Sequence, residues 1–171
     1  MTPASNNKTQ VSLPSDTEVR VTRDFNAPRA LVWRAHVESE LFRRWIGGYE
    51  GWSMPVCEMD VRVGGKYRWR WRQDAEGGEF GFYGEYREVD APSLLVQAEY
   101  YDPGTFGGEM PTTPTITRTT FTERDGVTTL VVLITYRSKE ERDAAISTGM
   151  TDGMETSYAR LDALTAEQQG S

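Results

Sequence analysis

The sequence predicts an α+β fold in which a curved antiparallel sheet wraps around one long C-terminal helix. Residues 66–72 alternate basic and aromatic side chains with the period of two that is typical of a β-strand. Further alternating runs follow, and the Asp125-Gly126 pair between two of them is a strong hairpin signal. From Ile146 to Leu164 the apolar residues recur instead at three- and four-residue spacing, which indicates a helix.

One strand and two short helices are predicted before the aromatic strand. Residues 17–25 alternate and form the first strand. The segment from Asn26 to Pro28 predicts a helix start, because Asn26 or Ala27 lies near the cap and proline is tolerated in the first turn. A kink then leads to a second short helix with apolar residues at helical spacing, which the glycine pair 47–48 ends.

The middle of the chain predicts a long antiparallel meander. We expect its strands at residues 54–61, 66–73, 80–89, 94–101, 115–122 and 128–136. A sheet of this size twists and curls, so one helix can lie in the curl and cover its concave face. A single helix rarely fills that space, and we therefore expect an internal cavity open at one end.

The last segment has its own start signal and a predicted interruption. Ser138 and Glu141 have the spacing of a capping box. Gly149 and Gly153 each cost about 1 kcal/mol inside a helix. Either the helix is broken near Gly149, or the glycines allow close approach of a neighbouring strand.

Length and composition favour one domain. We expect a disordered leader at residues 1–15, rich in Ser, Asn, Thr and Pro, a single domain at 16–168 and a short tail at 169–171. The net charge of -7 argues against a surface for nucleic acid or an anionic membrane. No apolar stretch approaches the ~18 residues of a membrane helix, and the N-terminus lacks a signal pattern, so we expect a cytoplasmic protein.

The sequence gives little support for a metal site or for a nucleophilic catalytic residue. Cys57 is the one cysteine and His36 the one histidine, which leaves too few ligands for a structural zinc site. We expect His36 to be a cation at a helix C-terminus and Cys57 to be buried on its strand. No catalytic residue, metal or cofactor is predicted.

An aromatic and methionine-rich set forms the candidate ligand site. Tryptophan and tyrosine carry a polar group that a pocket can use, and methionine packs around varied ligands, although each residue could equally belong to an ordinary core. The candidate ligand-binding residues are Trp45, Trp69, Trp71, Phe82, Tyr100, Met150, Met154 and Tyr158. The glycine-rich loop that carries Phe106 and Met110 is either a plain connector or a mobile lid.

A set of short motifs in a fixed order carries a family resemblance. These are residues 23–28 with 32–33, 41–45, 60–65, 84–89, 128–130, 149–154 and 161–164. In this order the chain resembles the SRPBCC superfamily of START-like, birch-pollen-allergen-like helix-grip domains. Within it, the chain is similar to bacterial single-domain proteins related to the C-terminal domain of the heat-shock-protein-ninety ATPase activator. The resemblance covers roughly Thr17 to Leu164 and implies the helix-grip fold.

The resemblance leaves the function open, because the superfamily includes lipid carriers, hormone receptors, polyketide cyclases and co-chaperone domains. Our first hypothesis is that the protein, as a monomer or homodimer, binds a small, mostly apolar molecule in the cavity. The alternative is a cyclase, dehydratase or hydrolase, which requires an acid–base pair inside the cavity. A chaperone partner is a third hypothesis, by analogy with the activators, and requires an exposed interaction patch.

Overall fold

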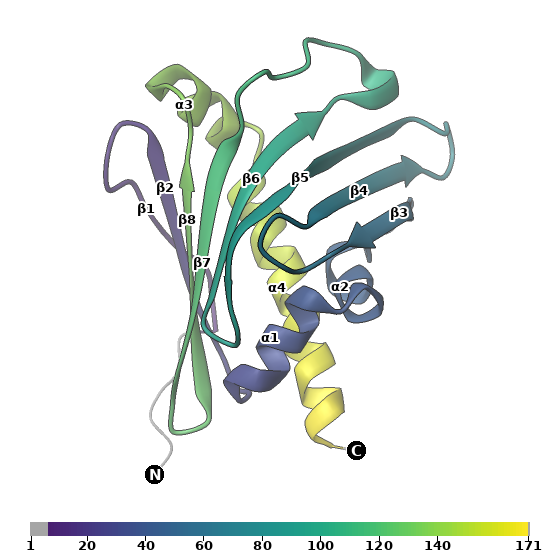
Figure 1. The fold of residues 1–171 in the computed structure, drawn as a ribbon. Coiled ribbons are helices and arrows are strands. Elements are labelled where there is room, and N and C mark those ends of the chain that lie inside the picture. Colours follow the sequence, from purple (N-terminus) through teal and green to yellow (C-terminus); the bar gives the residue numbers. More distant parts are fainter. Residues whose placement is uncertain (1–6, 171) are drawn as a thin grey trace.

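The computed structural model describes residues 7–170, which form an eight-stranded antiparallel sheet curved around the C-terminal helix (Figure 1). This architecture confirms the predicted α+β helix-grip class. The strands are β1 (Gln10–Ser12), β2 (Glu18–Phe25), β3 (Trp52–Met59), β4 (Lys66–Gln73), β5 (Glu79–Asp90), β6 (Leu94–Asp102), β7 (Thr115–Arg124) and β8 (Val127–Thr135). The helices are α1 (Arg29–Val37), α2 (Ser39–Ile46), α3 (Lys139–Ser147) and α4 (Met150–Gln169), with one 3₁₀ turn, η1 (Gly104–Phe106).

The strand order β1-β2-β8-β7-β6-β5-β4-β3 follows from a simple path of the chain. Strands β3 to β8 form a meander, each pairing with the next. Helices α1 and α2 carry the chain from β2 to the opposite edge of the sheet, where β3 begins. Strand β2 therefore pairs with β8, and α4 lies along the concave side (Figure 1).

The predicted strands agree with the observed ones to within two residues, but the N-terminal leader was predicted wrongly in part. Val11 pairs with Val21, so β1 extends the sheet at its edge through backbone hydrogen bonds. The side chains of β1 are exposed, and its sequence therefore carries no apolar alternation that could reveal it. Residues 1–6 of the leader lie outside the described residues, and in the expected tail Gln169 still belongs to α4.

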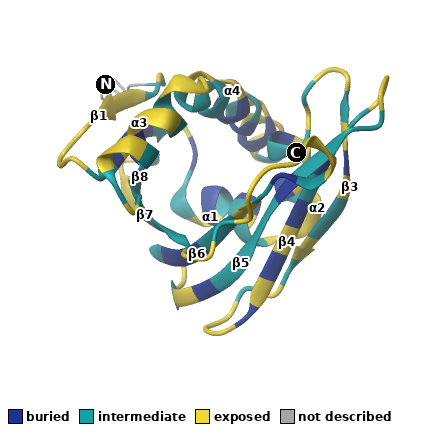
Figure 2. Ribbon diagram, turned by 90° about the horizontal axis from the view of Figure 1, so that it is seen from above, coloured by how far each residue is buried: buried dark blue, intermediate teal, exposed yellow. Residues whose placement is uncertain are grey.

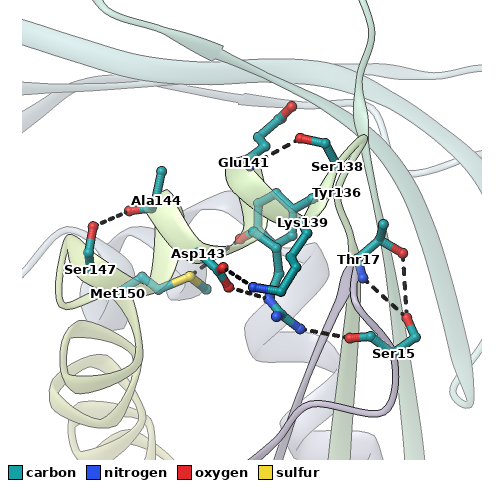
Figure 3. Close-up of polar contacts among 11 residues, drawn as sticks. Ser15, Thr17, Tyr136, Ser138, Lys139, Glu141, Asp143, Ala144, Ser147 and Met150 are labelled. Atoms are coloured by element: carbon teal, nitrogen blue, oxygen red, sulfur yellow. Dashed lines mark hydrogen bonds and ion pairs between the residues drawn. The ribbon is translucent and has the colours of Figure 1, made fainter.

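The structure confirms one predicted helix cap and corrects another. Ser138 Oγ accepts a hydrogen bond from the Glu141 backbone N–H at 3.1 Å, which is the N-cap half of the predicted capping box (Figure 3). The Glu141 carboxylate pairs with Arg137 instead. Gly149 has a φ of 83°, which separates α3 from α4 and confirms the predicted break. At α1, by contrast, the N-cap is Pro28, with no side-chain cap, rather than Asn26 or Ala27.

We expect Ser138→Ala to lower the free energy of unfolding by about 1 kcal/mol, because the first turn of α3 loses its side-chain acceptor. For a domain of this size that corresponds to a fall in Tm of about 2–4 °C. Ser147→Ala at the other end of α3 is the matched control, since Ser147 Oγ only donates to the Ala144 carbonyl (Figure 3). Equal losses in both variants, measured by thermal unfolding, would contradict the capping role.

A buried ion network fixes α4 to the sheet. Arg23 on β2 is 3% exposed. Its Nε and Nη2 donate to the two carboxylate oxygens of Glu155, each at 3.0 Å, and its Nη1 lies 2.7 Å from Asp162 Oδ2. The Thr9 backbone N–H also donates to Glu155, at 2.6 Å, which ties in the chain just before β1. Burial opposes the charge on Glu155, yet the hydrogen bonds from Arg23 and Thr9 lower its pKa to about 2.

Candidate ligand-binding site

The concave face of the sheet and the helices around it line a pocket of about 1020 Å³. Figure 2 shows from above the strands and helices that surround it. Side chains two residues apart on each strand point into the pocket, as the strand period requires. From the strands these are Trp52, Trp69, Trp71, Phe80, Phe82, Gln97, Glu99, Tyr101, Thr115, Thr117, Thr119, Val132 and Ile134, and from α4 they include Met150, Met154, Ser157 and Tyr158.

The pocket brings together most of the residues that the sequence put forward. Lining it are Trp45, Trp69, Trp71, Phe82, Met150, Met154 and Tyr158. They come from α2, β4, β5 and α4, elements that are far apart in the sequence. Their part in binding a ligand stays a prediction.

The prediction that Tyr100 lines the pocket is wrong. It lies between Glu99 and Tyr101, which both line the pocket, so its own side chain belongs to the other face of β6. There its ring stacks on Tyr83 at a centroid distance of 5.2 Å. The sequence analysis selected the wrong register of this strand because both alternating sets contain an aromatic residue.

The loop residues Phe106 and Met110 lie outside the described pocket wall. Phe106 is 55% exposed, and its ring packs at 6.4 Å from the rings of Trp52 and Phe80, which do line the pocket. Met110 is 49% exposed. Pro111 of the same loop contributes to the wall, so the loop borders the pocket, and its role as a lid stays a prediction.

The indole N–H groups of three pocket tryptophans are either hydrogen-bonded or buried. Trp45 Nε1 donates to the Ala35 carbonyl at 2.8 Å, and Trp71 Nε1 donates to the Ile46 carbonyl at 3.3 Å. Trp69 Nε1 is buried and has no hydrogen-bond partner among residues 7–170. A buried donor without a partner is costly, and the same burial keeps Trp69 Nε1 away from the open space of the pocket.

His36 is not the cation at a helix C-terminus that the sequence predicted. Its Nδ1 lies 2.8 Å from the Val32 carbonyl, which places the proton on Nδ1. The ring packs between Trp45 and Phe121, each at a centroid distance of 4.9 Å, and it lines the pocket. Burial lowers the pKa of His36 to about 4, so the imidazole is neutral at physiological pH.

Glu99 is the pocket residue that sequence reasoning missed. It lies on β6, opposite Gly84 of β5, which in turn lies opposite Tyr67 of β4. The Tyr67 hydroxyl donates to Glu99 Oε1 at 2.9 Å. Burial raises the pKa of Glu99 to about 7, although the hydrogen bond from Tyr67 opposes this.

A signal for Glu99 was present in the sequence. Gln97, Glu99 and Tyr101 alternate on a strand whose other positions are largely apolar, and polar residues at every second position either face solvent or line a polar wall. The aromatic residues of this strand are the more conspicuous pattern, and they draw attention away from its polar positions.

Neither a metal site nor a membrane-spanning helix is found in the described part of the chain. Over residues 7–170, no group of three His, Cys, Asp or Glu side chains is arranged to hold a metal ion. No helix in the same range is long and apolar enough to cross a membrane.

The curved sheet, the long C-terminal helix and the pocket between them define a helix-grip domain. Comparison with known families assigns it further. The model of the family Activator of Hsp90 ATPase homolog 1-like protein matches residues 26–166, and the chain belongs to this family. No curated protein matches the sequence.

Solved structures of bacterial proteins share the fold over almost the whole chain. A protein from Rhodobacter sphaeroides is 26% identical with a TM-score of 0.82, and the match covers 94% of this chain and 99% of that one. Protein Ms6760 from Mycobacterium smegmatis is 23% identical with a TM-score of 0.80 and the same coverages. An AHSA1-like protein from Aeromonas hydrophila is 17% identical with a TM-score of 0.64, over 84% of this chain and 92% of that one. The last two show the fold alone.

Proposed function

We propose that the protein binds a small, mostly apolar molecule in the pocket. The observation that carries this proposal is a space of about 1020 Å³ lined by aromatic rings from four neighbouring strands and from α2 and α4. Ligand sites typically have volumes of about 300–1,000 Å³ and mostly apolar walls with a few polar groups. A ligand that buries roughly 300 Å² of apolar surface gains about 7 kcal/mol from that burial, before the costs of association.

Polar groups on the wall support an oriented binding mode. Thr117 and Thr119 contribute hydroxyl groups from β7, and Glu99 contributes a carboxyl group from β6. On α4, Met150 and Met154 provide side chains that adapt to the ligand's shape.

Native mass spectrometry of freshly purified protein is the first test. We expect a reproducible adduct that denaturation releases as an apolar small molecule. A titration with the neutral fluorescent probe N-phenyl-naphthylamine then measures the affinity and stoichiometry of binding, and we expect saturable, one-to-one binding.

A matched pair of variants on α3 locates that binding. Ala145 lines the pocket, so Ala145→Trp is expected to fill the mouth and reduce probe affinity by about 10-fold or more. Ser147 is exposed and does not line the pocket, so Ser147→Trp should bind like the unmodified protein. Failure of the unmodified protein to bind the probe, or equal binding by both variants, would overturn the proposal.

Catalysis in the same pocket is a second candidate, which the Glu99–Tyr67 pair favours. A carboxyl group with a pKa of about 7 is suited to proton transfer near neutral pH. If the protein is an enzyme, Glu99→Gln should abolish turnover while an apolar substrate still binds.

The chaperone partner implied by the family resemblance stays a prediction, which stoichiometric retention of a chaperone in a pull-down would support.

A further inference from the structure

We propose that the pocket takes an organic cation, in which a protonated amine pairs with Glu99 and an apolar body lies along the aromatic strands. This inference rests on the proposed function and narrows it to a chemical class of ligand. It follows from the position of Glu99, from the charges around it and from the rings beside it.

The structure holds the Glu99 carboxylate at one place on the pocket wall. Tyr67, Gly84 and Glu99 lie in one row across β4, β5 and β6. Gly84 has no side chain, and a Cβ there would lie 2.9 Å from the Tyr67 hydroxyl oxygen, so the Tyr67 side chain crosses the sheet at Gly84 to reach Glu99. On the other side, Thr115 Oγ1 donates to the Glu99 backbone carbonyl at 3.2 Å. Tyr67 of β4 therefore holds the carboxylate, and Thr115 of β7 holds the backbone of the same residue.

No cationic side chain among the described residues pairs with Glu99. Within residues 7–170, the side chain that hydrogen-bonds to its carboxylate is that of neutral Tyr67, whose pKa burial and Glu99 both raise. The nearby hydroxyl of Tyr136 on the β8 side is also neutral, since burial and then Glu99 raise its pKa to about 12. Burial likewise raises the pKa of Tyr86 on β5, so this hydroxyl is neutral too.

The other charged or titratable groups of the pocket do not supply the missing charge. On the α1 side His36 is neutral, as described above. Arg137 lines the pocket, but its Nε lies 2.8 Å from Glu141 Oε2, so its charge is already paired. From β7, the strand next to β6, Thr115 and Thr117 contribute only uncharged hydroxyl groups. A desolvated carboxylate gains most from an opposite charge, and the ligand is the remaining source of one.

Aromatic rings lie next to this carboxylate. Trp69, Phe82 and Tyr101 form the following row across the same three strands, with Trp69 paired to Phe82 and Phe82 to Tyr101. The Tyr67 ring stacks on Trp69 at a centroid distance of 4.4 Å, which makes the two rows continuous. An amine beside Glu99 therefore has aromatic faces within reach for a cation–π contact, and the apolar body of the ligand covers the row beyond.

Three small probes of matched shape test this inference: naphthylmethylamine, naphthalenemethanol and naphthoic acid. Binding is measured by quenching of tryptophan fluorescence at about pH 8, where both the amine and Glu99 carry their charges. We expect the amine to bind at least about 10-fold more tightly than the alcohol, and the acid to bind most weakly. At about pH 5.5 Glu99 is protonated in the free pocket, and the advantage of the amine should fall several-fold.

Two variants assign the preference to Glu99. Glu99→Gln keeps the shape and removes the charge, so it should bind the amine and the alcohol about equally. Glu88→Gln changes the net charge by the same amount on the exposed face of the sheet and should keep the full preference.

Each outcome of the titration has a distinct meaning. Two results would overturn the proposed cation preference but not the apolar pocket. In the first, Glu99→Gln still binds the amine more tightly than the alcohol. In the second, the alcohol or the acid binds the unmodified protein as tightly as the amine does. If neither the alcohol nor the amine binds, the proposed function fails as well.

Discussion

Replacing Arg23 with methionine is expected to lower the free energy of unfolding by about 3 kcal/mol. Breaking a buried ion pair from one side typically costs about 3–5 kcal/mol, because it leaves the partner charge without compensation. We expect the lower end, since the side chains of Glu155 and Asp162 are 35% and 31% exposed and water screens them in part. Methionine retains the apolar stem over Phe25, whose ring lies 4.8 Å from the guanidinium carbon, so the loss reports mainly on charge.

Urea unfolding provides the measurement, and Arg34→Met provides the control. Arg34 pairs with Glu38 at 2.7 Å on the surface of α1, with both side chains about half exposed. Such a pair contributes about 0.5 kcal/mol or less, so this variant should unfold almost like the unmodified protein. Similar losses in both variants would contradict a special role for the buried network.

The Arg23 network also has a defined pH signature. The pKa of Glu155 is lowered from an ordinary 4.5 to about 2, so its contribution to stability is present above about pH 4.5 and is lost as the pH falls towards 2. In Arg23→Met this loss should be smaller, because the guanidinium no longer lowers the pKa of Glu155 while the Thr9 hydrogen bonds remain. Acid unfolding followed by circular dichroism compares the two proteins.

Glu99→Gln is expected to stabilise the protein in neutral and alkaline solution by up to about 3 kcal/mol. The pKa of Glu99 is raised from 4.5 to about 7, so the unfolded chain gives up this proton at lower pH than the folded protein does. The stabilising contribution of the neutral carboxyl is full below about pH 4.5, declines as the pH rises, and is lost above about pH 7. Glutamine stays neutral throughout, so the difference between the variant and the unmodified protein should grow over that interval.

Thermal unfolding of ligand-free protein across this pH range makes the comparison, with Glu88→Gln as the control for a change of net charge on the exposed face. A Glu99→Gln variant that tracks the unmodified protein at every pH would show that the Glu99 carboxyl is as well solvated in the folded state as in the unfolded one. A variant that is less stable at high pH would show that the charged form is favoured in the pocket.

Local patterns were enough to predict most of the fold. The alternation in β4 and the N-cap at Ser138 depend on neighbouring residues alone, and both are confirmed. Strand β1 shows the limit of this reasoning. Its three residues are exposed and pair only through their backbone, so nothing in their side chains marks a strand.

The site was harder to predict because its properties depend on strand register and on distant contacts. Tyr100 and Tyr101 are equivalent by composition, and only the pairing of β6 with β5 decides which of them faces the pocket. His36 looks like a cation at a helix end until the rings of Trp45 and Phe121 are placed around it. Glu99 acquires its unusual environment from Tyr67, which reaches it across Gly84.

The pairing of β2 with β8 also determines how the chain must assemble. Glu18 of β2 lies opposite Thr135 of β8, and both carboxylates that pair with Arg23 lie on α4. Strand β2 therefore cannot take its place in the sheet before β8 and α4 have formed. The hairpins from β3 to β8 join sequence neighbours and can form early, whereas closing the β2–β8 pair requires a loop that spans most of the chain. During synthesis, the sheet is therefore expected to remain open until β8 and α4 have left the ribosome, and the pocket forms only then.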